Sequence, residues 1–238
     1  MKRLSIDSIE LRDLGFSYRD GNPVFTDVCY RFDAGKSVFL QGATGAGKTT
    51  LIKLLLGLLR PTCGELLISG TPVNDLSFHE FSSYRLNMGF SSEEGGLVNN
   101  LTIYENFKLP MDYHNYQAPE SRREYIVELF REFGLDKQMY LRPSFVSGET
   151  RKLASLLKAF LLNPEVLILH NPTMGLVSEC IEPIARLISK HQKERNLRHT
   201  IITSEDPKLL RCLEGQVLQV TPTCLRESAL DAVKKGAA

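Results

Sequence analysis

The sequence carries almost no net charge, no long apolar run and no closely paired cysteines. Its net charge of +1 over 238 residues offers no basic footprint for nucleic acid, so we expect no nucleic-acid partner. Charges, glycines and prolines interrupt every apolar stretch before it reaches the length of a membrane span. Five cysteines without a C-x-x-C pair are typical of a reducing compartment. Because Met1 leads into charged residues and not into an apolar signal segment, we expect a cytoplasmic protein.

One glycine-rich run carries a binding chemistry. Residues 42–49 read G-x-x-x-x-G-K-T, the phosphate-binding P-loop. Its glycines let backbone N–H groups turn toward phosphate oxygens, and the helix that follows directs the positive end of its dipole at the same anion. Lys48 would reach the outer phosphates, and Thr49 would offer its hydroxyl to Mg²⁺. The residues expected to bind ATP are Gly42, Ala43, Thr44, Gly45, Ala46, Gly47, Lys48, Thr49 and Thr50.

Strand and helix patterns alternate on both sides of the P-loop. Short apolar segments bounded by turn residues predict strands, whereas apolar residues at helical spacing predict helices. Proline lacks the N–H that a helix interior needs, so Pro183 is expected to kink the last of these helices or to delay its start. The expected strands lie at 9–14, 24–32, 37–41, 65–70, 166–169 and 200–203, and the expected helices at 51–59, 121–133, 149–162 and about 181–188. Such alternation predicts a mostly parallel sheet.

The order of these motifs resembles the ATP-binding cassette (ABC) ATPases along nearly the whole chain. The resemblance implies an α/β P-loop NTPase fold, with a RecA-like, mostly parallel core sheet, an N-terminal antiparallel β subdomain and a helical subdomain. It implies one ABC ATPase domain over residues 1–238, with its core at about 1–90 and 161–238 and its helical subdomain at about 91–160. It also implies that Tyr18 stacks on adenine, a contact worth about 1–3 kcal/mol. The alternative is an ordinary tyrosine at the end of a strand.

The chain departs from this family at the signature sequence. Where the family has L-S-G-G-Q, which caps the triphosphate bound on the opposite subunit, this chain reads Val146-Ser147-Gly148-Glu149-Thr150. Glu149 would bring negative charge toward the γ-phosphate, and two like charges about 4 Å apart repel by roughly 1 kcal/mol in water. Alternatively, Glu149 points to solvent as an ordinary residue of the first helical turn.

A second departure removes the acidic residues that follow the Walker B strand. Where the family reads Asp-Glu-Pro-Thr after four apolar residues, this chain reads His170-Asn171-Pro172-Thr173. His170 replaces the aspartate that anchors the Mg²⁺ shell, and imidazole is a poor partner for this hard cation. Asn171 replaces the glutamate that polarises the attacking water. An amide cannot accept that proton, and general-base catalysis is worth about 10²–10⁴-fold. An unrelated strand followed by a turn is the alternative.

Three further positions differ from the family pattern. Glu93 stands in place of the Q-loop glutamine and still offers Mg²⁺ an oxygen, together with Thr49; Glu94 is the neighbouring alternative. Glu205 stands in place of the histidine that contacts the γ-phosphate, and a carboxylate cannot donate that hydrogen bond unless it is protonated. Val177 replaces the aspartate that links the two sites of the dimer.

These departures predict a pseudo-ATPase, a nucleotide-binding subunit of an ABC transporter that binds ATP but is deficient in hydrolysis; whether it retains Mg²⁺ stays open. The resemblance implies a second ABC ATPase subunit, in a homodimer or a heterodimer, and integral membrane permease subunits that hold the chain on the inner face of the inner membrane. One alternative is a working ATPase with Glu93 on the metal and Glu205 as base. Another is an ATP-responsive regulatory or scaffold subunit of an envelope machine.

A finer resemblance concerns the cargo. Segment 97–111 and the Pro143-Ser144 approach to the signature are similar to the ATPases of bacterial Mla/Mce-type lipid transporters, although FtsE-like and LolD-like cassettes share much of this text. This resemblance implies a phospholipid cargo and a periplasmic lipid-binding protein as a further partner.

Overall fold

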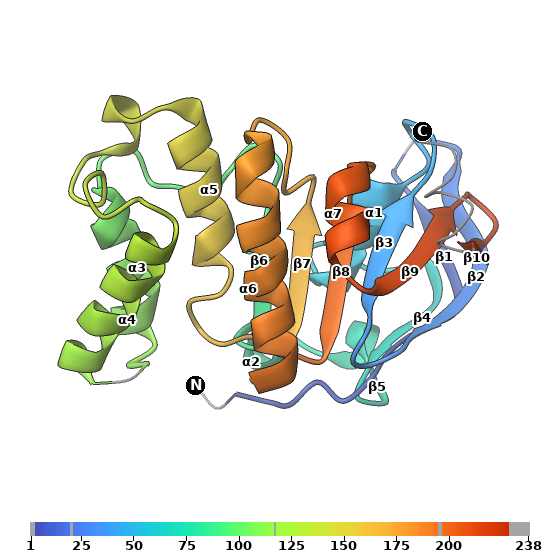
Figure 1. Cartoon of the computed structure of the whole chain (residues 1–238). Helices are drawn as coiled ribbons and strands as arrows, with labels where there is room; N and C mark the ends of the chain where they lie inside the picture. Colours follow the sequence, from blue (N-terminus) through green and yellow to red (C-terminus); the bar gives the residue numbers. More distant parts are fainter. Residues whose placement is uncertain (1–2, 20, 117, 195–196, 229–238) are drawn as a thin grey trace.

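Two β-sheets and the helices around them form the protein. The computed structural model describes residues 3–19, 21–116, 118–194 and 197–228, and Figure 1 shows their arrangement. Within these residues, one sheet has six strands in the order β10-β9-β3-β8-β7-β6, and the other has four in the order β2-β1-β4-β5. This is the α/β architecture that the P-loop and the strand–helix alternation predict.

The six-stranded sheet is parallel except at one edge. β3, β6, β7, β8 and β9 pair in parallel, whereas β10 pairs with β9 in the antiparallel sense. β3, β7 and β8 carry buried apolar runs, as expected for strands covered on both faces. The bounds are β3 Ser37–Gln41, β6 Met88–Ser91, β7 Val166–His170, β8 His199–Thr203, β9 Gly215–Val220 and β10 Leu225–Ser228.

The four-stranded sheet is antiparallel throughout, which agrees with the expected N-terminal β subdomain. Its strands are β1 Ile9–Ser17, β2 Pro23–Phe32, β4 Cys63–Ile68 and β5 Thr71–Pro72. Five of the six expected strands begin and end within two residues of the expected positions, and β3 matches them at both ends. β1 runs three residues further than expected, and β5, β6, β9 and β10 were not expected.

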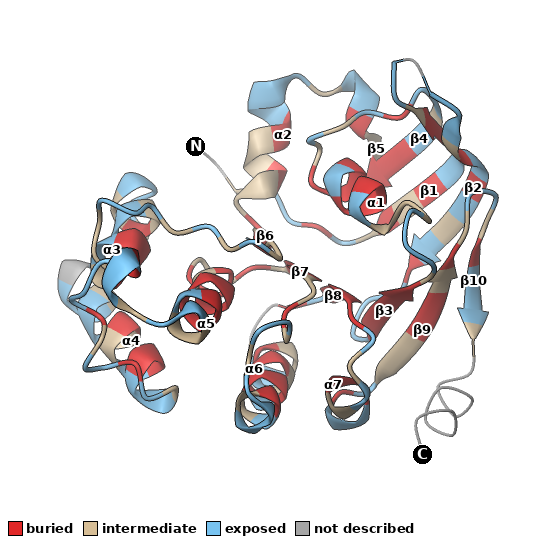
Figure 2. Cartoon of the chain, turned by 90° about the horizontal axis from the view of Figure 1, so that it is seen from above, coloured by how far each residue is buried: buried red, intermediate tan, exposed pale blue. Residues whose placement is uncertain are grey.

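Helices cover both faces of the core sheet. In Figure 2, α6 and α7 lie on one face, α1 lies on the other beside the antiparallel sheet, and α3, α4 and α5 gather beyond the β6 edge. The helix bounds are α1 Lys48–Leu55, α2 Phe78–Arg85, α3 Ile103–Tyr113, α4 Pro119–Glu132, α5 Gly148–Lys158, α6 Ile181–Glu194 and α7 Pro207–Cys212. Short 3₁₀ turns lie at Val73–Asp75, Pro143–Phe145 and Ser178–Cys180. No helix in the described ranges is long and apolar enough to cross a membrane.

The core sheet separates two apolar clusters because side chains alternate along each strand. Val38 and Leu40 of β3 belong to the cluster shared with α1 and the antiparallel sheet. Phe39, between them, belongs to the cluster shared with α5, α6 and the helices beyond β6, including Phe107 and Phe130. The helices between residues 103 and 158 therefore pack onto the core through a continuous apolar layer.

Three helix expectations were wrong in detail. The helix expected over 149–162 ends at Lys158. The helix after the P-loop ends at Leu55 and not near Leu59, because the chain turns at Gly57, whose φ is 62°. A Cβ there would lie 2.3 Å from the Phe81 ring, so the close approach of Phe81 requires glycine at this turn. Pro183 neither kinks α6 nor delays its start at Ile181. It lies in the first turn, where backbone N–H groups have no partner within the helix.

The buried ring of His199 predicts how stability depends on pH. His199 is 1% exposed at the start of β8, and burial lowers its pKa from 6.5. The unfolded chain therefore binds this proton more readily than the folded chain. We expect the free energy of unfolding to hold above pH 6.5 and to fall below it, by up to about 1.4 kcal/mol per pH unit from this residue.

Urea unfolding of His199→Gln at several pH values measures that contribution. The variant should lose part of the pH slope of the wild type between pH 6.5 and 5. His79→Gln, on the exposed face of α2, controls for the loss of one imidazole. Equal slopes for His199→Gln and the wild type would contradict the assignment.

Candidate functional site

The P-loop opens onto a cavity of about 700 Å³ at the carboxyl edge of the core sheet. Gly47 precedes α1 with a φ of 97°, a conformation that glycine adopts without strain. Gly42 also has to be glycine, since a Cβ there would lie 2.7 Å from the Val220 carbonyl oxygen. All but two of the residues expected to bind ATP line this cavity. Those that line it are Thr44, Gly45, Ala46, Gly47, Lys48, Thr49 and Thr50.

Lys48 folds back over the loop that precedes it. Its ammonium group donates hydrogen bonds to the carbonyl oxygens of Gly42 and Ala43, the second at 3.1 Å. These contacts hold the cation beside the positive end of α1, so that both face the cavity. Gly42 and Ala43 do not line the cavity themselves, and they contribute to the site through the carbonyl groups that hold Lys48.

Tyr18 lies at the rim of the same cavity. Its ring is 47% exposed and packs edge-on against Phe16, with the ring centroids 4.9 Å apart. Its hydroxyl lies 3.2 Å from the Thr50 hydroxyl. A face of the ring thus stays available beside the P-loop, as an adenine platform requires, and its role as platform stays a prediction.

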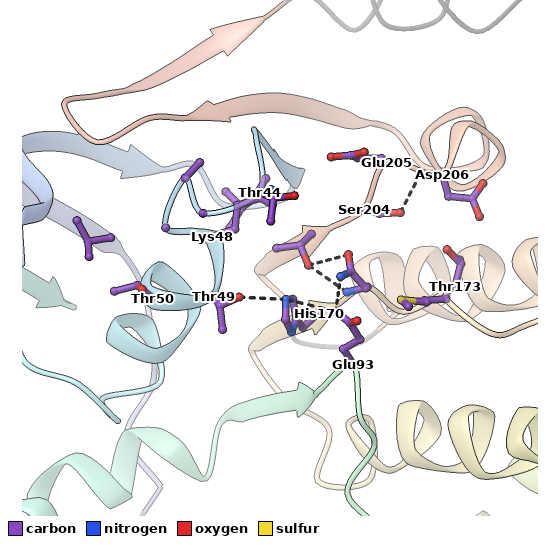
Figure 3. Close-up of a pocket in the computed structure, with 18 of the residues that line it drawn as sticks. Thr44, Lys48, Thr49, Thr50, Glu93, His170, Thr173, Ser204, Glu205 and Asp206 are labelled. Carbon is purple, nitrogen blue, oxygen red and sulfur yellow. Dashed lines mark hydrogen bonds and ion pairs between the residues drawn. The ribbon is translucent and has the colours of Figure 1, made fainter. Parts of the chain in front are cut away.

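His170 faces the P-loop from the end of β7. Its Nε2 atom lies 3.4 Å from the Thr49 hydroxyl and 3.9 Å from Glu93 Oε2, as Figure 3 shows. Burial lowers the pKa of His170, the Glu93 carboxylate opposes this shift, and Lys152 and Lys48 add to it. The ring is therefore neutral at pH 7, so a nitrogen lone pair is available in the cavity.

Asn171 connects β7, β8 and Glu93. Its backbone N–H donates to the carbonyl oxygen and the hydroxyl of Thr203, both at 3.0 Å. These bonds hold it at a φ of 46°, a conformation that asparagine tolerates better than most residues. Its side-chain amide donates to Glu93 Oε2 at 2.5 Å. The amide is thus committed to a carboxylate that comes from the loop after β6.

Glu93 is fixed by its backbone as well as by its side chain. It follows β6, and its carbonyl oxygen accepts a hydrogen bond of 2.9 Å from Lys152 Nζ of α5. Lys152 also donates to the Ser92 carbonyl oxygen at 3.3 Å. Glu93 lines the P-loop cavity, whereas Glu94 lines a neighbouring one. Of the two candidates for the Q-loop position, Glu93 is therefore the one beside the P-loop.

Glu205 and Asp206 follow β8 and both line the P-loop cavity. Glu205 is exposed, so its carboxylate reaches the cavity from solvent (Figure 3). Asp206 caps α7 by accepting hydrogen bonds from the N–H groups of Lys208 and Leu209, at 2.9 and 3.4 Å. The Asp206 carboxylate is therefore engaged in capping α7, whereas the Glu205 carboxylate is available to a ligand in the cavity.

The signature residues do not line the P-loop cavity of their own chain. Ser147 caps α5, its hydroxyl oxygen accepting from the Thr150 N–H at 3.0 Å. Glu149 makes contacts within its own chain that the sequence analysis did not anticipate. Its carboxylate accepts a hydrogen bond of 3.0 Å from the Val177 N–H and lies 3.7 Å from Cys180 Sγ. Glu149 therefore ties the signature to the segment that follows β7.

Two residues near this site escaped the sequence analysis. Lys152 is 8% exposed, and burial lowers its pKa; it follows Glu149, Thr150 and Arg151, so its local sequence did not mark it as buried. Thr203 is 1% exposed, and nothing in its local sequence distinguished it from the other residues of β8. Among the described residues, no three histidine, cysteine, aspartate or glutamate side chains gather into a metal cluster.

Comparisons with known proteins agree with this geometry. The chain is 31% identical over 185 residues to the ABC transporter ATP-binding protein YtrE of Bacillus subtilis. This match covers 77% of this chain and 80% of YtrE. It is 28% identical to the lipoprotein-releasing system ATP-binding protein LolD of Buchnera aphidicola, over 85% of this chain and 90% of LolD. The solved dimeric structure of the ATP-binding cassette MJ0796, bound to ADP and Pi, superposes with a TM-score of 0.83. That match has 25% identity and covers 93% of this chain and 98% of MJ0796.

The family model for ABC transporters matches residues 25–174, from the second strand through the segment after β7. The match includes the P-loop, Glu93, the signature and the altered Walker B end. The chain therefore belongs to the ABC transporter family, as a nucleotide-binding subunit.

Proposed function

We propose that this subunit binds ATP and hydrolyses it slowly or not at all. The observation that carries the proposal is the set of groups at the end of β7, where His170 and Asn171 take the place of two acids. The Asn171 amide is hydrogen-bonded to Glu93 at 2.5 Å, so it neither accepts a proton nor is free to orient water. Without a general base, the reaction loses about 10²–10⁴-fold in rate.

Binding draws on groups that the chain retains. The N–H groups of the P-loop and Lys48 would hold the phosphates, and Tyr18 would stack on the base. Thr49 and Glu93 would hold a divalent cation, which when bound neutralises charge on the phosphates. Each of these residues lines the P-loop cavity. The bound nucleotide would then act as a structural or regulatory ligand.

The proposed setting is a transporter on the inner face of the bacterial inner membrane. The chain would pair with a second cassette, either its own copy or an intact one, and dock on integral membrane permease subunits. The likeness to LolD and the text of segment 97–111 favour a lipid or lipoprotein cargo. A periplasmic lipid-binding protein would be a further partner.

One observation favours an alternative function. Glu93 and Glu205 both line the P-loop cavity, so a working ATPase could place Glu93 on the cation and use Glu205 as base. In that case Glu205→Gln would abolish phosphate release. An ATP-responsive scaffold differs from both functions, because it would bind ATP without engaging a permease in pull-down experiments.

ATP binding should appear as thermal stabilisation. At ATP near ten times Kd, linkage adds about 1.4 kcal/mol to the stability of the fold, so the melting temperature should rise. Lys48→Ala should abolish this rise, because it removes the charge that faces the phosphates. Lys36→Ala, at an exposed lysine outside the cavity, is the matched control. No rise at millimolar ATP would contradict the binding proposal.

Restoring the family residues should restore hydrolysis, but only as a set. Asn171→Glu alone places a second carboxylate against Glu93, and two carboxylates at that distance share one proton. The triple variant Glu93→Gln, His170→Asp and Asn171→Glu removes this conflict. Steady-state phosphate release should rise at least about tenfold in the triple variant, a modest share of what a general base provides, and stay at the wild-type level in Asn171→Glu.

The comparison between these variants decides what Glu93 does. Equal rates for Asn171→Glu and the triple variant would show that Glu93 does not obstruct a restored base. Release by the wild type at the speed of an active cassette ATPase would contradict the proposed function itself. A triple variant carrying Lys48→Ala as well controls for contaminating ATPases.

A further inference from the structure

We propose that the cation accompanying ATP in this chain is a first-row transition-metal dication such as Mn²⁺ or Co²⁺, held by His170, Glu93 and Thr49 in preference to Mg²⁺. The inference rests on the proposed function, because the same nucleotide would supply the remaining oxygens. It concerns a donor set in which His170 replaces the aspartate that usually anchors the Mg²⁺ shell.

Three donor atoms converge on one corner of the cavity from three different elements. Thr49 Oγ1 comes from α1, His170 Nε2 from the end of β7, and Glu93 Oε2 from the loop after β6 (Figure 3). The imidazole nitrogen lies 3.4 Å from the hydroxyl oxygen and 3.9 Å from the carboxylate oxygen. Two atoms that each bind one cation at about 2.1 Å lie at most about 4.2 Å apart. Both spacings are therefore compatible with a shared cation.

The chemistry of this donor set does not fit Mg²⁺ well. Mg²⁺ prefers a full shell of oxygens in octahedral geometry, whereas an imidazole nitrogen is a common ligand of the later divalent metals. The His170 side chain is 17% exposed, so most of the ring is enclosed by the protein. A nitrogen fixed beside the Thr49 hydroxyl would favour Co²⁺ over Mn²⁺, following the affinity order of the first-row dications. The preference over Mg²⁺ comes from the imidazole itself, because Mg²⁺ prefers oxygen ligands.

Glu93 retains the capacity to bind a cation although Asn171 donates to it. A carboxylate has two oxygens with about four acceptor sites, and the 2.5 Å bond from the Asn171 amide takes one of them. The hydrogen bond from Lys152 Nζ to the Glu93 carbonyl oxygen, at 2.9 Å, fixes the backbone that carries this carboxylate. The carboxylate therefore brings one negative charge to the donor set and is held in place from both sides.

The protein donors are too few to hold a cation without the nucleotide. The described chain has no group of three histidine, cysteine, aspartate or glutamate side chains suited to a metal, and the set contains two charged or imidazole ligands and one hydroxyl. Tight binding should therefore require ATP. This property separates a nucleotide-linked cation from an independent metal site.

The test is the Kd of ATP measured by calorimetry in excess Mg²⁺, Mn²⁺ or Co²⁺. The wild type should bind ATP at least about tenfold more tightly with Co²⁺ than with Mg²⁺, a ratio equivalent to about 1.4 kcal/mol, because the imidazole of His170 suits Co²⁺ better than Mg²⁺. His170→Ala should reduce this ratio to the preference of ATP itself, and His170→Asp should shift it toward Mg²⁺. His79→Asp, on the exposed face of α2, makes the same replacement away from the cavity and should leave the ratio unchanged.

A second readout does not depend on affinity. Electron spin echo spectra of the complex with Mn²⁺ and ATP should show coupling to a directly bound imidazole nitrogen, and His170→Ala should remove it. Equal Kd values with Mg²⁺ and Co²⁺, or a ratio unaffected by His170→Ala, would overturn the inference while leaving ATP binding intact. Failure to bind ATP with every cation would instead overturn the proposed function together with the inference.

Discussion

The parallel pairing of β3, β8 and β7 is the constraint on which the site depends. Leu40 pairs with Thr203, and Thr203 pairs with His170, so the three strands end at one edge of the sheet. The P-loop, the residues after β8 and the altered Walker B end are thereby brought together from positions far apart in the sequence. A side-chain change at one strand end is felt by the groups that follow the others.

The acidic groups beside the P-loop come from a different segment of the chain than in the family pattern. No acid directly follows β7; its last residue is His170, and Asn171 comes next. The carboxylate beside the P-loop comes instead from Glu93, after β6, and Asn171 donates to it at 2.5 Å. An active ATPase that lacks the acids after β7 would need a carboxylate from another segment. Here that carboxylate already accepts the amide and lies 3.9 Å from an imidazole, an arrangement that favours holding a cation over activating water.

The sequence predicted the fold class and six of the strands, because a P-loop and short buried apolar runs are local signals; β5, β6, β9 and β10 were not predicted. The comparisons and the structure confirm the α/β cassette fold. What the sequence missed depends on contacts between distant residues. The turn after α1 requires glycine because Phe81 packs against Gly57, and the Glu149 carboxylate accepts a hydrogen bond from Val177, 28 residues further along the chain. Whether Glu93 or Glu94 lies beside the P-loop likewise depends on the direction in which the chain leaves β6.

The most direct test of the central claim is a single-turnover experiment with the subunit in excess over γ-labelled ATP. Binding without cleavage predicts that labelled ATP is recovered intact after many minutes, whether Mg²⁺ or Co²⁺ is supplied. Typical enzymes turn over at about 1–10³ s⁻¹. Release of the label within seconds, abolished by Lys48→Ala, would contradict the account.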